Sequence, residues 1–141
     1  MNRTATCHCG QVRVTCEGEP ELVIACHCEL CQRRTGSVMH VGAWFNESNV
    51  QFEGETNVYT RTDGDQGSAV DFHFCPKCGT SIWWPIPSRP EVVGIAVGCF
   101  ADPSFPIPSF SIYNKRRHDW VSNPQGDPAF AVLPPSNSGD A

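Results

Sequence analysis

The spacing of the cysteines constrains this chain more than any other feature of its sequence. The 141 residues include nine cysteines, an odd number that argues against a framework of disulfides. Seven of them form three short groups: Cys7-x-Cys9, Cys26-x-Cys28-x-x-Cys31 and Cys75-x-x-Cys78. Closely spaced thiols of this kind are typical of zinc ligands, because a tight turn brings two sulfurs to the separation that a tetrahedral ion requires.

The groups can be divided between metal ions in one way that keeps each local group intact. The two pairs together supply four thiolates for a closed site, from Cys7, Cys9, Cys75 and Cys78. The triplet supplies three and leaves a fourth position open, from Cys26, Cys28 and Cys31. Closed four-cysteine sites are structural, whereas three protein ligands with an open position are typical of reactive zinc. We therefore predict one structural and one catalytic zinc ion, and the alternative is a single structural zinc with spare reduced thiols.

The two isolated cysteines continue apolar faces in the sequence. Cys16 alternates with Val12 and Val14, and Cys99 alternates with Val97. A buried free cysteine behaves as a small apolar residue, so we predict that both pack in the core without a ligand role. The alternative is that one of them closes the triplet as its fourth ligand.

Short apolar runs separated by turn residues indicate a mostly β protein. The chain contains 12 glycines and 12 prolines, which interrupt long helices. Periodicity predicts one short helix over residues 29–35 and a turn over 62–67. It predicts strands over residues 10–16, 22–25, 38–45, 50–53, 57–61, 69–74, 81–84 and 91–100. No internal linker is visible, so we predict one domain, 1–133, followed by a flexible C-terminal tail, 134–141.

Charge and hydropathy exclude two classes of partner. Ten Lys and Arg stand against 15 Asp and Glu, giving a net charge of −5, which argues against binding to nucleic acid. The longest apolar run, 92–100, is about half the length of a membrane span, so no membrane partner is expected. The N-terminal residues lack the apolar core of a signal peptide. We therefore expect a cytoplasmic protein with reduced thiols.

The three cysteine motifs, taken in order, resemble those of a known enzyme family. They read Cys7-x-Cys9-Gly10, then Cys26-His27-Cys28-x-x-Cys31-x-x-x-x-Gly36-Ser37, then Phe74-Cys75-x-x-Cys78-Gly79. This pattern is similar to that of the glutathione-dependent formaldehyde-activating enzymes and the related centromere protein V-like proteins. The resemblance implies a zinc-stapled, Mss4-like β fold and the same division of the seven cysteines into a structural and a catalytic zinc site.

The resemblance also implies an activity. The family's reaction joins formaldehyde to the thiol of glutathione, formally a carbon–sulfur lyase reaction in reverse, so the implied partners are a small aldehyde and a small thiol. One departure is Ser111, which stands where relatives often have histidine.

The alternative function is a non-catalytic zinc module that binds a partner or senses thiols. A methionine sulfoxide reductase is a further alternative, but it would need two C-x-x-C pairs. One pair here is C-x-C, which argues against that class of enzyme.

Several polar residues are secondary candidates for the open site. His27 either carries protons near the metal or is held by hydrogen bonds away from it. Arg33 or Arg34 is the better candidate to bind a carboxylate of glutathione, and the default interpretation of residues 115–117 is a solvated basic turn. Glu29 is predicted to be exposed, as is His8.

Overall fold

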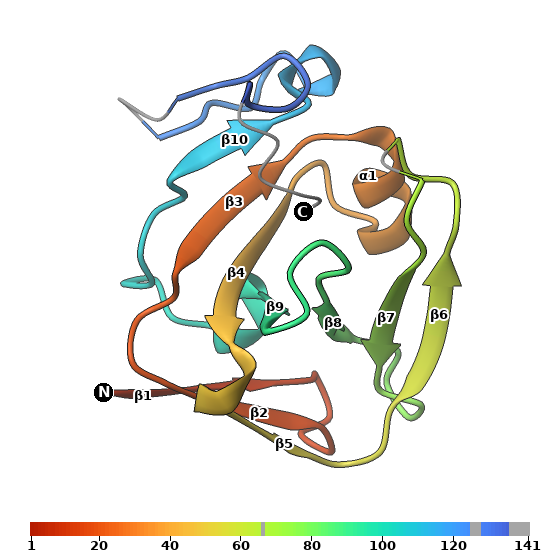
Figure 1. The fold of residues 1–141 in the computed structure, drawn as a ribbon, viewed down its shortest axis with the longest axis vertical. Coiled ribbons are helices and arrows are strands. Elements are labelled where there is room, and N and C mark those ends of the chain that lie inside the picture. Colours follow the sequence, from red (N-terminus) through yellow and green to blue (C-terminus); the bar gives the residue numbers. More distant parts are fainter. Residues whose placement is uncertain (66, 125–127, 136–141) are drawn as a thin grey trace.

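The computed structural model describes residues 1–65, 67–124 and 128–135, and it confirms the mostly β fold. The described residues form ten strands in two sheets with one short α-helix, α1 (Glu29–Thr35). The small sheet has the order β1-β2-β5, with β1 (Asn2–Thr6), β2 (Arg13–Glu17) and β5 (Val50–Glu53). It closes one end of the molecule, below the larger sheet in Figure 1.

The large sheet has seven strands in the order β10-β3-β4-β9-β8-β7-β6. They are β3 (Leu22–Cys26), β4 (His40–Asn46), β6 (Asn57–Arg61), β7 (Val70–Phe74), β8 (Ser81–Pro85), β9 (Val92–Ala96) and β10 (Phe110–Ile112). Neighbouring strands are antiparallel except for β10, which pairs in parallel with the end of β3. In Figure 1 the sheet curves so that β6 and β7 stand opposite β3, with α1 between their upper ends.

The helix α1 begins and ends where its sequence provides caps. Cys28 is the N-cap residue, and its sulfur accepts a hydrogen bond from the backbone N–H of Cys31. Gly36 adopts the left-handed conformation, φ 73°, that ends the helix, and its N–H donates to the Gln32 carbonyl. The predicted helix is therefore confirmed, and its cap is one of the predicted metal ligands.

Two apolar clusters fill the molecule, and each surrounds one group of cysteines. The first contains Cys7 and Cys75 together with the buried face of β2, including Val14 and Cys16. The second contains Cys26 and Cys31 together with large aromatic side chains. Each cysteine group therefore packs against its own part of the core, with Cys28 and Cys78 half-buried and Cys9 exposed.

Trp84 is central to the second cluster, and two glycines make room for it. A Cβ at Gly94 would lie 2.4 Å from Trp84 Cε2, and one at Gly42 would lie 2.9 Å from its Cζ2. The indole therefore lies flat on the backbone of β4 and β9. Its ring also contacts Phe72 and His40, at centroid distances of 5.7 and 5.0 Å. The rings of Trp84, Phe72 and His40 therefore pack together in the core near the end of β7 and α1.

The structure corrects the predicted elements at three places. Strand β1 was not expected, because only Ala5 of its five residues is fully buried and no apolar alternation marks it. Strand β10 was missed because three residues are too short for a periodic signal. The predicted strand 91–100 ends at Ala96, and a 3-10 helix, η2 (Val97–Phe100), follows, ending at the left-handed Ala101.

The remaining elements complete the description. Two further 3-10 helices, η1 (Glu47–Asn49) and η3 (Asn114–Arg116), lie before β5 and after β10. Of the predicted tail, 134–141, only residues 134 and 135 are within the described part of the chain. Among the described residues, no helix is long and apolar enough to cross a membrane.

Candidate functional site

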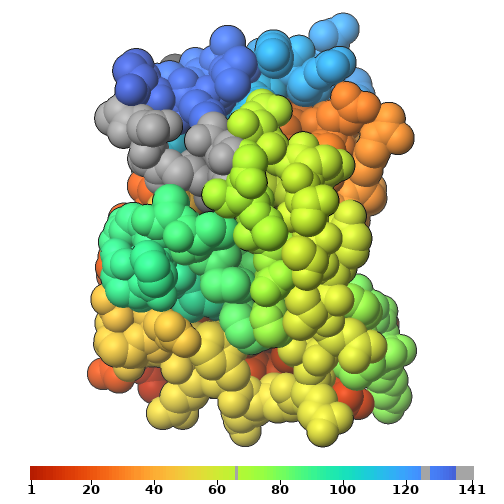
Figure 2. Space-filling view, turned by 45° about the vertical axis from the view of Figure 1, so that its right-hand side comes forward, coloured from red at the N-terminus to blue at the C-terminus, as the bar shows by residue number. Residues whose placement is uncertain are grey.

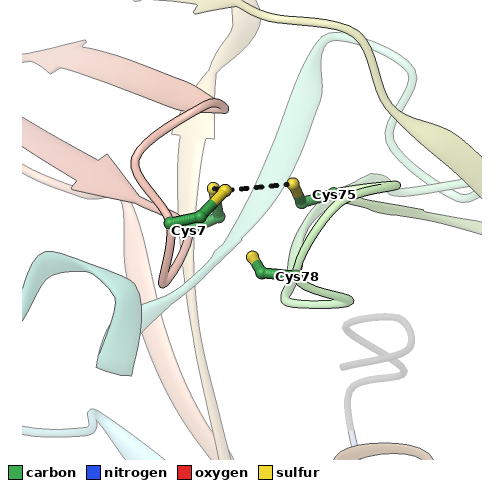
Figure 3. A group of neighbouring side chains, drawn as sticks. Cys7, Cys75 and Cys78 are labelled. Carbon is green, nitrogen blue, oxygen red and sulfur yellow. Dashed lines mark hydrogen bonds between the residues drawn. The ribbon is translucent and has the colours of Figure 1, made fainter.

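The first cysteine group forms where two turns meet. The turn after β1 carries Cys7 and Cys9, and the turn between β7 and β8 carries Cys75 and Cys78 (Figure 3). All four sulfurs lie within 4.8 Å of one another. Cys9 Sγ lies 3.6 Å from Cys7 Sγ and 3.7 Å from Cys75 Sγ. Four thiolates around a zinc ion at about 2.3 Å lie roughly 3.8 Å apart, so this group, the quartet, fits zinc.

Hydrogen bonds hold the two turns of the quartet together. The backbone N–H of Val12 donates to Cys7 Sγ at 3.2 Å, and the N–H of His8 donates across to Thr80 Oγ1 at 3.1 Å. Thr80 Oγ1 also lies 3.3 Å from Cys78 Sγ. Hydrogen bonds from the Thr80 hydroxyl and backbone lower the pKa of the Cys78 thiol to about 5. Cys78 is therefore a thiolate at neutral pH, the form that binds metal.

The second cysteine group comes from one short segment. Cys26 ends β3, Cys28 caps α1 and Cys31 lies in its first turn, and the three sulfurs lie within 4.8 Å of one another. The thiols of Cys26 and Cys31 hydrogen-bond to Cys28 Sγ, which lowers the pKa of Cys28 and raises that of Cys26. Without metal, this group, the triplet, therefore concentrates negative charge on Cys28. Three converging sulfurs with one side open are a donor set that fits zinc with a vacant fourth position.

A cavity of about 250 Å³ lies on the open side of the triplet. Its walls come from three parts of the chain: α1, the turn after β6, and the segment after β10. Figure 2 shows these parts gathered on one face, with the yellow-green residues near 60 between the orange α1 and the blue C-terminal residues. Besides the cysteines, the lining residues are Glu29, Leu30, Arg61, Asp63, Gly64, Asp65, Tyr113, Lys115 and Arg116.

Tyr113 is the most unusual residue of this lining. Its backbone is left-handed, φ 54° and ψ 38°, a conformation that costs a non-glycine residue about 1–3 kcal/mol. Burial, with a hydrogen bond to the Asp65 carboxylate, raises the pKa of Tyr113 above its ordinary value. The phenol therefore stays protonated, and its single O–H donates to Asp65 within the lining of the cavity.

The predicted polar candidates divide between the cavity and its surroundings. Lys115 and Arg116 line the cavity, and Arg116 lies 3.5 Å from Glu29, which is exposed as predicted. His27 is fully buried, and its Nε2 lies 2.9 Å from Asn123 Oδ1. Asn123 donates in turn to Asn114. His27 therefore belongs to a hydrogen-bonded network rather than to the lining of the cavity.

The remaining predicted residues supply no sulfur to the quartet or the triplet among the described residues. Cys16 is fully buried in the first apolar cluster, as predicted, whereas Cys99 is half-buried in η2. Neither belongs to the quartet or the triplet among the described residues. His8 is exposed, as predicted. Ser111 is buried and accepts a hydrogen bond from Asn114 at 3.0 Å.

Sequence reasoning missed Arg61 and Tyr113 as lining residues. Arg61 ends strand β6 before the Asp- and Gly-rich turn, and Tyr113 follows β10. They reach the triplet only because the sheet curves and because β10 pairs with β3. No local motif in the sequence marks either residue.

Comparison with known proteins gives three similarities. The model of the family described as glutathione-dependent formaldehyde-activating enzyme matches residues 2–116. A curated protein of Halomonas elongata, provisionally named as an enzyme of that description, is 25% identical over 136 residues, which cover 92% of this chain and 87% of the relative. A crystal structure of a Rhodobacter sphaeroides protein is 24% identical with a TM-score of 0.49, covering 92% of this chain and 99% of that chain.

Proposed function

Since the chain belongs to the glutathione-dependent formaldehyde-activating enzyme family, we propose that it catalyses the reversible addition of formaldehyde or another small aldehyde to the thiol of glutathione. Formally this is carbon–sulfur lyase chemistry. The family resemblance that the cysteine motifs indicated is confirmed by the match over residues 2–116. We assign the activity to the unit 1–133 and to the cytoplasm, where thiols remain reduced.

The observation that supports this proposal is the triplet beside its cavity. Cys26, Cys28 and Cys31 would hold a zinc ion whose fourth position faces the 250 Å³ space. Zinc bound there would supply an open ligand position and stabilise a thiolate, the nucleophilic form of a thiol. The quartet would hold the structural zinc, because it has four protein sulfurs and no position left for a substrate.

The side chains around the cavity suit the addition step. The thiol first loses its proton to solvent; a lone pair of the resulting thiolate forms the carbon–sulfur bond, the π electrons of the aldehyde move to its oxygen, and that oxygen takes a proton back from solvent. The Tyr113 hydroxyl, which donates to Asp65 in the free protein, lines this space and would turn from Asp65 to the aldehyde oxygen as negative charge develops there. The basic side chains of Lys115 and Arg116 favour the same charge.

Two measurements on the reduced protein test this function. Native mass spectrometry with and without glutathione gives the number of zinc ions and any glutathione adduct. Exchange NMR with ¹³C-formaldehyde and glutathione measures how fast free and thiol-bound formaldehyde interconvert. We expect two zinc ions, an adduct and faster exchange with enzyme present. One zinc, no adduct and no acceleration would instead leave a non-catalytic zinc-binding domain.

A further inference from the structure

A second cavity of about 450 Å³ adjoins the cavity of the triplet. Both cavities are lined by Leu30, Arg61 and Asp63, so a ligand in one can extend into the other. The second cavity also contains Arg34 and several aromatic rings, including that of Phe72. It is therefore a partly aromatic space with guanidinium groups in its wall.

Arg61, which is buried, and Arg34, which is half-buried, both lie around the ring of Phe72. Their guanidinium carbons lie 3.9 and 5.4 Å from its centroid. Arg61 is only 6% exposed, and Arg34 donates to Ser81 Oγ at 3.3 Å. The Nε atom of Arg61 has no hydrogen-bond partner among the described residues, whereas the Arg34 guanidinium also hydrogen-bonds to the Cys31 sulfur. Neither guanidinium forms an ion pair with a carboxylate there, although Asp63 lines the same space.

The charge balance around this pair is incomplete. A buried charge is stable only when it is paired and hydrogen-bonded. A zinc ion with three thiolates formally carries one negative charge, which balances one of the two guanidinium groups. His40, packed on Trp84, adds no charge, because burial lowers its pKa to about 3. Asp63 lines both cavities but forms no ion pair with either guanidinium, so neither Arg34 nor Arg61 has a bonded carboxylate among the described residues.

We propose that Arg34 and Arg61 form a carboxylate-binding subsite for the thiol substrate. This inference rests on the proposed function, because it places the thiol sulfur at the triplet. The carboxylate of the same molecule would then lie in the second cavity, bound by the planar donor edge of a guanidinium. The subsite selects thiols that carry a carboxylate several bonds from sulfur, such as a peptide thiol, over small neutral thiols.

Calorimetry on the zinc-loaded protein tests the subsite with three probes: glutathione, its diethyl ester and S-methylglutathione. We expect the ester to bind about ten- to hundredfold more weakly than glutathione, the effect of losing hydrogen bonds to a charged group. Arg61→Gln should weaken glutathione by a similar factor and leave the ester unchanged. Arg61→Lys should recover part of the loss. Arg89→Gln, which removes an exposed guanidinium paired with Glu21 and Glu91, is the matched control and should change neither.

Three outcomes would overturn the subsite. One is equal affinity of the wild-type protein for glutathione and its diester. Another is an Arg61→Gln variant that loses zinc, or weakens both ligands equally, which would make Arg61 a counter-charge for the thiolates. The third is that Arg61→Gln leaves S-methylglutathione binding unchanged. S-methylglutathione has no free thiol, so its binding does not depend on the aldehyde reaction. If its binding depends on Arg61, the subsite is supported even when no aldehyde exchange is detected. Failure of the subsite can therefore be distinguished from failure of the proposed function.

Discussion

The quartet and the triplet are built from the same side chain, yet they have opposite relations to the fold. The quartet joins two turns that lie 66 residues apart, between Cys9 and Cys75, and its four sulfurs lie within 4.8 Å of one another. The triplet comes from six consecutive residues, and its open side faces a cavity lined by charged side chains. The quartet closes a long loop of the chain, whereas the triplet joins residues that are already neighbours in the sequence.

This difference explains how one residue type can serve two purposes in a small domain. Closure of a long loop by a metal ion would remove much conformational freedom from the unfolded chain, so we expect the quartet to contribute mainly to stability. A local group like the triplet relies on the surrounding core for its position. Cys26 and Cys31 are buried and pack against aromatic residues, and this packing holds the triplet in place. The triplet therefore needs no fourth protein ligand to fix its position.

Breaking the quartet should have the largest effect. We expect Cys78→Ser to prevent stable folding, because structural zinc contributes about 10–16 kcal/mol of apparent binding energy in small zinc domains. Most domains have less than about 15 kcal/mol of total stability. Circular dichroism melting and a ¹H–¹⁵N spectrum check this expectation. A variant with dispersed resonances and an unchanged melting temperature would contradict the structural role.

Breaking the triplet should abolish activity and spare the fold. We expect Cys28→Ser to lose one zinc ion and to slow aldehyde exchange more than about a hundredfold, beyond the effect of outer-shell changes at metal sites. The melting temperature should fall by only a few degrees. Zinc analysis, exchange NMR and calorimetry measure these three quantities. Cys99→Ser is the matched control and should keep both ions; retained activity in Cys28→Ser would remove the triplet from the mechanism.

A smaller effect is expected at the wall of the triplet cavity. Tyr113→Phe removes one hydrogen-bond donor and should lower the maximal exchange rate about tenfold, the equivalent of a single hydrogen bond. Zinc content and glutathione affinity should stay unchanged, which separates this effect from a loss of packing. The measurement is the exchange rate as a function of formaldehyde concentration at saturating glutathione. An unchanged rate would show that the phenol only fills space.

The smallest effect is expected in the core between the two groups. Gly94→Ala places a Cβ 2.4 Å from Trp84 Cε2, so the indole must move, at about 1–3 kcal/mol of stability. Urea unfolding measures the loss. Because Trp84 packs with the second apolar cluster, the triplet should lose zinc at lower chelator concentration while the quartet keeps its ion. Simultaneous loss of both ions would show that the two halves unfold as one unit.

The cysteine grouping could be predicted from the sequence for two reasons. The triplet is local in the chain, and each of the two cysteine pairs can complete a four-sulfur group only with the other pair. Alternation likewise predicted β2, since Val14 and Cys16 share its buried face. The wall of the cavity could not be predicted in this way. Arg61 and Tyr113 come from strands at opposite edges of the large sheet, and only its curvature brings them together. Local patterns contain no information on that curvature.

The parallel pairing of β10 with β3 has a consequence for the order in which the protein is made. All seven clustered cysteines have been synthesised once Cys78 has been added, and they leave the ribosome ahead of the residues that follow. The strand that brings Tyr113 and Lys115 to the cavity comes more than thirty residues later, and it pairs with the strand that ends at Cys26. On the proposed function, metal would be able to bind to a nascent chain in which this part of the cavity wall is still missing, and β10 would complete the wall afterwards.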